Sequence, residues 1–112
     1  MKVEKPREIM DNLILELKRG TLVLSVLASL HEPQYGYSLV QVLEERNIPI
    51  EAGTLYPLLR RLESQQLLKS EWETSGSKPR KYYIISETGQ EVLKQLKAEW
   101  TTLSTQMNEI LK

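Results

Sequence analysis

The apolar pattern of this chain changes its period twice, and the order of these changes limits the fold more than any other feature of the sequence. Up to about residue 66 the apolar residues recur at helical spacing. Two short runs follow, "LLKSEWE" and "RKYYIIS", whose aromatic and β-branched residues predict strands, and "TSGSKP" between them predicts the loop of a hairpin. From residue 86 the helical spacing returns and continues to residue 112. The pattern therefore predicts an α+β fold that is mostly α.

Prolines divide the helical part of the chain that precedes the hairpin. Pro33 disfavours helical backbone at the residue before it, and Pro49 confirms a break after Asn47, which suits a helix end. Residues 1–8 are polar, and we expect them to be loosely held or disordered. The predicted helices, of which the first is either one helix or two joined near Gly20, are residues 9–30, 37–46 and 53–66.

Three compact helices followed by a hairpin is the plan of a winged helix-turn-helix domain. We expect residues 1–86 to form this domain and residues 87–112 to form a long C-terminal dimerisation helix in the same compact unit. Ser86 or Thr88 can cap the start of that helix, since Glu91 follows Thr88 at the spacing of a capping box. A plain α+β domain without a nucleic-acid role has the same order of elements, so the chemistry of the third helix and the hairpin must decide.

The composition excludes several classes of function. The chain has no Cys, which rules out disulfides and thiolate chemistry, and His31 is its single histidine. The sequence contains no nucleophile and base set, metal-ligand cluster or glycine-rich phosphate loop, so we expect no enzyme, catalytic residue, metal or cofactor. The start, "MKVEKPREIMDNLILELKRG", is not a signal peptide, and the longest uncharged stretch, "GTLVLSVLASL", is too short to span a bilayer. We therefore expect a cytoplasmic protein with no membrane partner.

Positive charge is concentrated in one central segment, although the formal net charge is zero. Residues 54–81 contain six Lys or Arg against three Asp or Glu, whereas the segments on either side carry a small negative excess. Docking to phosphate depends on such a local patch rather than on the total charge. The distribution gives modest support for a nucleic-acid partner.

The stretch "GTLYPLLRRLE" carries the chemistry of the third predicted helix. Pro57 suits the first turn of a helix, where amide N–H groups lack partners, so we expect the helix to begin near residues 52–54. Thr54 can cap this end or donate to a phosphate, and Tyr56 and Arg60, one turn apart at an exposed edge, can face one groove. The residues expected to dock the helix on the first two helices are Leu55, Leu58, Leu59 and Leu62.

Basic residues of the hairpin strengthen the nucleic-acid interpretation. By themselves, Arg60 and Arg61 are most simply solvated surface charges, and lysines on edge strands often serve only to prevent aggregation. The hairpin adds Lys78, Arg80 and Lys81 at its predicted tip and descending strand, where a flexible basic loop can hold a DNA backbone. Two basic features beside one helix start favour DNA binding, with Arg60 reading a base or neutralising a phosphate.

A strict heptad seam runs along the last predicted helix. A helix this long needs a partner for its apolar stripe, and we expect a second copy of the chain, because one DNA-reading module grips only one half-site. The alternative is that the helix folds back on its own domain, and both can hold if the first helix of the second copy completes the packing. The residues of the seam, spaced three and four apart, are Leu93, Leu96, Trp100, Leu103, Met107 and Ile110.

Three longer stretches resemble the PadR family of transcriptional regulators: "LHEPQYGYSLVQVLEE", "EAGTLYPLLRRLESQQLLKSEWE" and "SKPRKYYIISETGQEVL". The resemblance spans roughly residues 20–100 and implies a homodimer that binds a palindromic operator in double-stranded DNA, with the third helix in the major groove and the wing alongside. It also implies effector-relieved repression without catalysis. The positions that match the family's recognition helix are Thr54, Tyr56, Pro57 and Arg60. Those that match its wing are Lys78, Pro79, Arg80 and Lys81. Tyr37 matches the family tyrosine at the start of the second helix, where it touches a phosphate or merely packs.

The resemblance also implies a role for Trp100 beyond that of an interface anchor. Some members with a single short C-terminal helix leave a central cavity in the dimer, where a tryptophan of this helix stacks on flat aromatic compounds. Trp100 stands at a matching distance after "SETGQ", so it is a candidate contact for a small aromatic effector. The alternative function is a winged-helix module for protein–protein interaction, which would leave the basic wing and the helix start without a role.

Overall fold

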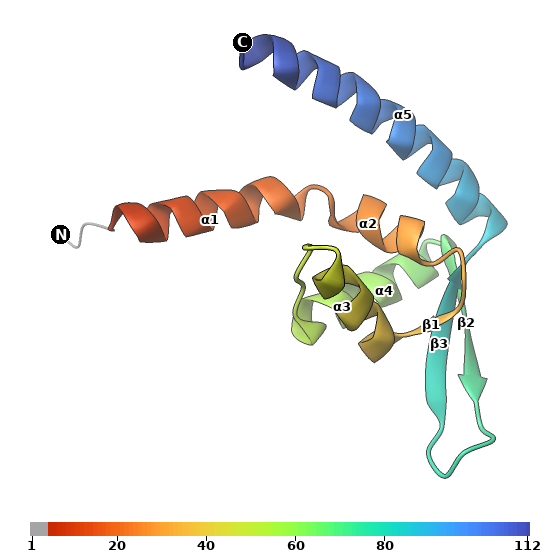
Figure 1. Ribbon diagram of the computed structural model, residues 1–112. Coiled ribbons are helices and arrows are strands. Elements are labelled where there is room, and N and C mark those ends of the chain that lie inside the picture. The colour runs from red at the N-terminus through yellow and green to blue at the C-terminus, as the bar shows by residue number, and fades with distance from the viewer. Residues whose placement is uncertain (1–4) are drawn as a thin grey trace.

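A computed structural model of the protein describes residues 5–112 and confirms the mostly helical fold with a small antiparallel sheet (Figure 1). The predicted order of elements is present, and one short strand that was not predicted, β1, precedes the helix predicted at residues 37–46. The elements are α1 (Pro6–Arg19), α2 (Leu22–Ser29), β1 (Gln34–Tyr35), α3 (Gly36–Glu45), α4 (Ala52–Ser64), β2 (Leu68–Glu73), β3 (Arg80–Ile85) and α5 (Glu87–Ile110).

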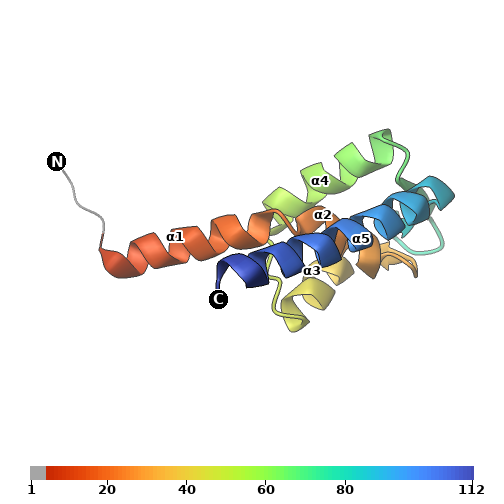
Figure 2. The same cartoon turned by 90° about the horizontal axis from the view of Figure 1, so that it is seen from above.

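The first predicted helical segment is two helices that meet at Gly20 and Thr21. The backbone N–H and the hydroxyl of Thr21 both donate to the Lys18 carbonyl, at 3.0 and 2.7 Å, and so satisfy an end carbonyl of α1. α2 buries Val26 and Leu27 completely, whereas α1 buries no side chain. In both views α1 extends beyond the rest of the domain (Figures 1 and 2).

The start of the chain differs from the expectation. α1 begins with Pro6 at its first helical position, where the missing N–H of proline has no helical partner to lose. The expectation that residues 1–8 are loosely held is therefore wrong for residues 6–8. Its first part, residues 1–4, lies outside the described part of the chain.

The leucines of α4 anchor that helix in the core, as predicted. Leu55, Leu59 and Leu62 are buried and Leu58 is half-buried. Burial of each leucine contributes about 2 kcal/mol, so the stripe fixes which face of α4 remains outside. The other buried apolar residues, from α2, α3 and the sheet, are Val26, Leu27, Leu30, Leu39, Leu43, Leu68, Tyr83 and Ile85.

The sheet has the order β1-β3-β2, and both pairings are antiparallel. β2 and β3 form the predicted hairpin, with Trp72 opposite Lys81 and Ser70 opposite Tyr83. The prediction treated "HEPQYGY" as a loop and missed β1, which pairs Tyr35 with Tyr82. A strand of two residues has no alternating pattern to detect, so only the fold reveals it. The hairpin tip extends away from the helices (Figure 1).

The start of α5 is fixed on the end of α4. Ser86 is the N-cap, since its Oγ accepts from the Gly89 N–H at 2.9 Å, and its hydroxyl donates to the Gln66 carbonyl at 2.7 Å. A Cβ on Gly89 would lie 2.1 Å from the Leu67 carbonyl oxygen, so the approach needs a glycine. Of the two predicted caps, Ser86 is confirmed and Thr88, which lies inside α5, is wrong.

Candidate nucleic-acid interface

The face of α4 opposite the leucines is exposed. It carries Thr54, Pro57, Arg60 and Arg61, all of them exposed side chains. The helix begins within the predicted range of positions, and its N-cap residue Glu51 makes no side-chain cap hydrogen bond. The first amide N–H groups of α4 are therefore not covered by a capping side chain, as an anion-binding helix start requires.

Pro57 lies in the second turn of α4, not in the first turn as predicted. Because α4 begins at Ala52, Pro57 is inside the helix and cannot donate to the carbonyl of Gly53, four residues earlier. Gly53 is exposed with open space around it, so water can satisfy that carbonyl. Thr54 also lies inside the helix, and the prediction that it caps α4 is wrong, although it stays exposed near the helix start.

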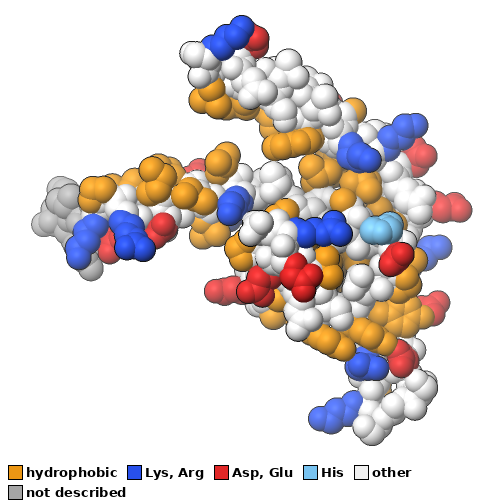
Figure 3. Space-filling model, viewed as in Figure 1, with side chains coloured by type: hydrophobic (Ala, Val, Ile, Leu, Met, Phe, Trp, Pro, Cys, Tyr) orange, Lys and Arg blue, Asp and Glu red, His pale blue; other side chains and the backbone are white. Residues whose placement is uncertain are grey.

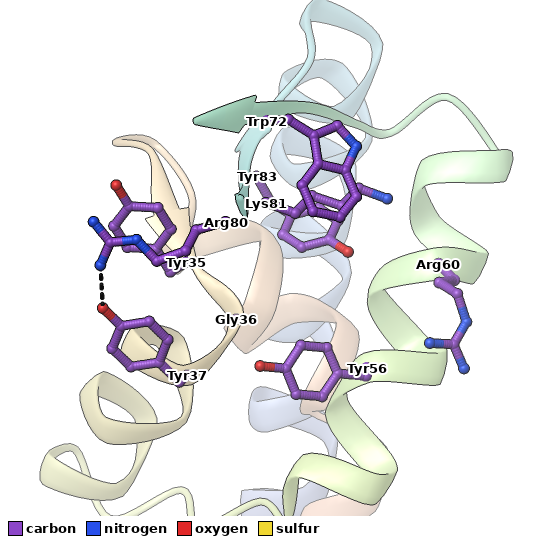
Figure 4. A pocket seen from close by; sticks show the side chains of 9 residues that line it. All are labelled: Tyr35, Gly36, Tyr37, Tyr56, Arg60, Trp72, Arg80, Lys81 and Tyr83. Carbon is purple, nitrogen blue, oxygen red and sulfur yellow. Dashed lines mark hydrogen bonds between the residues drawn. The ribbon is translucent and has the colours of Figure 1, made fainter. Parts of the chain in front are cut away.

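Tyr56 is half-buried against the start of α3, rather than at an exposed edge as predicted. A Cβ on Gly36 would lie 2.3 Å from a ring carbon of Tyr56 and 2.7 Å from its hydroxyl. The glycine in "YGY" thus allows the tyrosine ring to rest on α3. Arg60, one turn later, is also among the residues that line this pocket. The Tyr56 ring points into the pocket and the Arg60 guanidinium points away from it (Figure 4), so a common face of the two residues stays a prediction.

The hairpin separates two basic residues that the sequence analysis had grouped together. Neighbouring residues of a strand point to opposite faces, so Arg80 and Lys81 lie on different faces of β3. Lys81 shares the face of Tyr83 and of its cross-strand partner Trp72. The Lys81 Nζ lies 3.1 Å from a carboxylate oxygen of Glu63 on α4. The charge of Lys81 is therefore shared with a carboxylate rather than free at the wing tip.

Glu63 ties α4 to both strands of the hairpin. The Ser70 hydroxyl of β2 and the Lys81 ammonium of β3 donate to its two carboxylate oxygens. The hydrogen bond from Ser70 lowers the pKa of Glu63 below 4.5, burial opposes this shift, and Lys81 reinforces it. Burial alone would lower the pKa of Lys81, but the bond to Glu63 and the nearby Tyr83 outweigh it, and the pKa is raised.

Arg80 belongs to a second cluster with the tyrosines around β1. Its guanidinium lies 4.5 Å from the centroid of the Tyr35 ring and donates to the Tyr37 hydroxyl at 3.2 Å. It also approaches a carboxylate oxygen of Glu73 at 3.6 Å. Tyr37 therefore does more than pack, because it holds Arg80 in place while remaining half exposed. The guanidinium has five N–H donors, so it retains donors for a ligand.

The tip of the hairpin carries Lys78 and Pro79, both exposed. Lys78 takes part in none of the ion pairs found in residues 5–112. Of the predicted wing cations, Lys78 is thus the one whose charge is least engaged within the protein.

A pocket of about 390 Å³ lies between α3, α4 and the hairpin (Figure 4). Among the predicted residues it brings together Tyr37, Tyr56, Arg60, Arg80 and Lys81, and it leaves out the others at the α4 start, the α4 flank and the hairpin tip. Its further lining residues, which the sequence analysis missed as site residues, are Tyr35, Gly36, Trp72 and Tyr83.

The period of the strands contained a signal for some of the missed lining residues. Because side chains alternate along a strand, Tyr83 must share a face with Lys81. Trp72 joins them only through the pairing register of the hairpin, and Tyr35 only through β1. Register depends on the length and turn of the loop, so the sequence pattern alone did not supply it.

The heptad seam of α5 divides into two parts. Leu93 and Leu96 are half-buried and pack on the core of their own domain, so the fold-back alternative is correct for this part. The later seam residues are exposed, with Trp100 at 48%. Apolar side chains gather along α1 and on the side of α5 that faces it (Figure 3). The exposed apolar residues of these helices include Ile9, Met10, Leu13, Ile14, Leu17, Trp100, Leu103, Met107 and Ile110.

Residues 5–112 contain no group of three or more His, Asp or Glu side chains that could hold a metal ion. Within the same residues, no helix combines the length and the apolar character that crossing a membrane requires.

The fold and the exposed basic surface define a winged-helix domain, and comparison with known proteins agrees. Residues 23–95 match the transcriptional regulator PadR-like family. A PadR family transcriptional regulator from Eggerthella lenta DSM 2243 is 53% identical, with a TM-score of 0.91 over 95% of each chain. A PadR-like transcriptional regulator from Bacillus cereus strain ATCC 14579 is 30% identical, with a TM-score of 0.74 over 87% of this chain and 97% of that one.

A third similar structure is Bacillus subtilis PadR in complex with operator DNA. It is 20% identical and superposes with a TM-score of 0.63 over 68% of this chain and 45% of that chain, so it supports the fold alone. The chain belongs to the PadR-like family of transcriptional regulators. This membership confirms the family predicted from the sequence, and it places the protein among regulators rather than enzymes.

Proposed function

We propose that this protein is a sequence-specific DNA-binding repressor that binds a palindromic operator as a homodimer. The observation that carries the proposal is the pocket between α4 and the hairpin, which is lined by Arg60 of the helix and by Arg80 and Lys81 of the strand. Cations and hydrogen-bond donors on a helix and an adjacent wing suit a DNA duplex.

The two parts of this surface take different roles in the proposal. α4 enters the major groove, because its exposed face is fixed by the buried leucines behind it. Arg60 reads a base edge or holds a phosphate near it, and Thr54, Pro57 and Arg61 contact the flanking backbone. Lys78 and Pro79 at the hairpin tip follow the neighbouring backbone, where Lys78 supplies charge without base preference.

The exposed apolar faces of α1 and α5 are the reason for proposing a dimer. α1 buries no side chain, and Leu103 and Met107 of α5 are 48% and 40% exposed. Apolar faces of this size on two long helices are typical of subunit interfaces. A second copy would cover both faces and would present two recognition helices to the two halves of a palindrome.

A protein of similar fold, Bacillus subtilis PadR, was solved in complex with operator DNA. The proposal extends DNA binding to the present chain and assigns it to α4 and the hairpin.

The proposal includes release by a small aromatic effector at Trp100. This residue is 48% exposed in the middle of α5, within the face assigned to the dimer interface. Titration of flat aromatic cations should quench the fluorescence of Trp100 in a Trp72→Phe variant. The Trp72→Phe/Trp100→Phe variant should show no tryptophan fluorescence, and the same compounds should leave its affinity for DNA unchanged. An absence of any effect of such compounds on wild-type DNA binding would remove the effector from the proposal.

Footprinting and mobility-shift assays on the promoter region of the protein's own gene test the main proposal. Tight, salt-sensitive binding to one palindrome supports the regulator. Weak binding that ignores sequence would instead favour the second candidate, a winged-helix module that binds another protein.

A further inference from the structure

Another pocket, of about 620 Å³, lies between α1, the start of α2 and the loop that joins α3 to α4. Figure 1 shows this loop beneath the C-terminal end of α1. Half of the lining residues are apolar, and these are Ile14, Leu15, Leu22, Ile48, Pro49 and Ile50. The volume lies within the range of small-molecule sites, so the pocket offers an apolar floor of suitable size for an organic ligand.

α1 carries apolar side chains on two different sides. Leu13 and Leu17 share one side, because residues four apart on a helix are neighbours, whereas residues two apart do not face each other. Leu15 therefore points away from Leu17 and toward the pocket that it lines, and it is 54% exposed. A second copy of the chain that covers Leu13 and Leu17 would leave Leu15 uncovered and the pocket open.

The charged groups around this floor differ in how well their own helices accommodate them. Lys18 and Arg19 lie in the last turn of α1, where the negative end of the helix attracts cations. Glu44 lies in the last turn of α3, which has no basic residue, so the same end of that helix disfavours its carboxylate. Glu44 takes part in none of the ion pairs found in residues 5–112. Of these three charges, that of Glu44 gains most from an added partner.

Carboxylates also outnumber cations among the lining residues. Asp11 of α1 and Glu51 before α4 join Glu44, against Lys18 and Arg19. The pocket thus combines an apolar floor with a small negative excess. Charge complementarity favours an occupant with an apolar body and one positive group.

We propose that this pocket binds a small amphipathic organic cation, with its apolar body on Leu15 and Ile50 and its positive group near Glu44. Trp100, the effector contact proposed above, is not among the lining residues, so this is a separate site. Thr54 at the start of α4 also lines the pocket. An occupant therefore links α1 to the start of α4 and changes the affinity for the operator. That last effect rests on the proposed function, whereas binding of the cation does not.

A chemical-shift titration of the isotope-labelled full chain with phenylbutylammonium tests the site. Phenylbutanol and phenylbutyrate carry the same apolar body with no charge and with a negative charge, so affinity should fall in the order cation, alcohol, anion. The largest backbone amide shifts should occur at residues 48–51 and at Leu15. Equal affinity for the three compounds, or shifts centred on Trp100 of α5, would overturn the proposal.

Two adjacent carboxylates provide a matched pair of variants. Glu44→Gln keeps the size of the side chain and removes its charge, so it should weaken binding of phenylbutylammonium about 2- to 5-fold. Glu45→Gln is the control, because Glu45 is exposed and does not line the pocket, and it should bind like the wild type. An equal loss in both variants would contradict a specific role for Glu44.

Leu15→Asp distinguishes a small molecule from a second copy as the occupant. It places a charge on the apolar floor, so it should abolish measurable binding of phenylbutanol and still sediment like the wild type. The variant should remain folded, since α1 buries no side chain, and its thermal midpoint checks this. Loss of the dimer in this variant would identify the second copy as the occupant and overturn the proposal.

Anisotropy titrations on the footprinted operator test the effect on DNA. Saturating phenylbutylammonium should change the dissociation constant of the wild type by about 5-fold or more. Ethylammonium at the same concentration, which lacks the apolar body, should not. Amide shifts at the pocket with unchanged operator affinity would overturn the link to DNA. A wild type that did not prefer the operator to a scrambled duplex would refute the proposed function, and the shift titration would still decide the cation site.

Discussion

The Lys81 ammonium lies 3.1 Å from a carboxylate oxygen of Glu63, and this contact joins the wing to α4. Ser70 donates to the same carboxylate from the other strand of the hairpin. A single side chain on α4 thus contacts both strands of the hairpin. In the proposed complex, α4 lies in the groove and the hairpin on the backbone, so this contact links the two DNA-binding parts.

Replacing Glu63 with Gln should lower the free energy of unfolding by about 1 kcal/mol, because the amide cannot pair with the charge of Lys81. The side chains of Lys81 and Glu63 are 28% and 31% exposed, which limits the effect. Urea denaturation at pH 7 measures it. Glu109→Gln is the control, because its ion pair with Lys112 is 69% and 76% exposed and should contribute nothing measurable.

The same pair predicts a pH dependence in acid. The pKa of Glu63 is lowered by the hydrogen bond from Ser70 and the charge of Lys81, against the effect of burial. Its stabilising contribution is therefore complete above the ordinary value of 4.5 and is lost as the pH falls through the lower folded value. The difference in unfolding free energy between wild type and Glu63→Gln should shrink below pH 4.5. A constant difference down to the acid transition would contradict this.

Gly36→Ala should displace the Tyr56 ring, since the added Cβ would lie 2.3 Å from a ring carbon. We expect a loss of about 1–3 kcal/mol in stability from overpacking and a weaker complex with any DNA duplex. Thermal denaturation and anisotropy measure the two effects. Gly53→Ala is the matched control for stability, because nothing lies within 4 Å of its added Cβ. Equal stability of the two alanine variants would show that Tyr56 is not held against α3.

Leu103→Asp should separate the proposed dimer. Leu103 is 48% exposed on the seam of α5, so a charge there costs the monomer little but would be buried between two copies. Sedimentation velocity should show a dimer for the wild type and a monomer for the variant. Thr105→Asp, on the exposed opposite face of α5, should remain dimeric. If both variants sedimented like the wild type, the α5 seam would not be the interface.

The main features of the fold could be predicted from the sequence because they depend on periodic patterns. The helical spacing of the leucines identified α4, and the aromatic and β-branched residues of "RKYYIIS" identified β3. The end of α4 was less visible, since Gln66 adopts a left-handed φ of 65° that favours glycine. The matching end of α3 at Asn47, with φ of 62°, was predicted because asparagine tolerates this conformation.

The candidate site was predictable only in part, because it depends on contacts between distant segments. Arg80 and Lys81 are adjacent in sequence, but they belong to different clusters once the strand assigns their faces. Tyr83 was assigned to a strand without a functional role, and its position beside Tyr56 follows from the packing of α4 on the sheet. Pro57 was predicted in the first turn of the helix but lies in the second. The sequence does not show that Gly53 is exposed, so that water can satisfy the carbonyl to which Pro57 cannot donate.

Anisotropy titrations of wild type and Arg60→Ala against the footprinted operator and a scrambled duplex test the central claim most directly. The wild type should prefer the operator, and Arg60→Ala should lose about 1–3 kcal/mol of that preference if Arg60 reads a base. Lys78→Ala should weaken both complexes equally and flatten the salt dependence, because it contacts only phosphate. Equal affinity of the wild type for the two duplexes would contradict the account of α4 as a helix that recognises a DNA sequence.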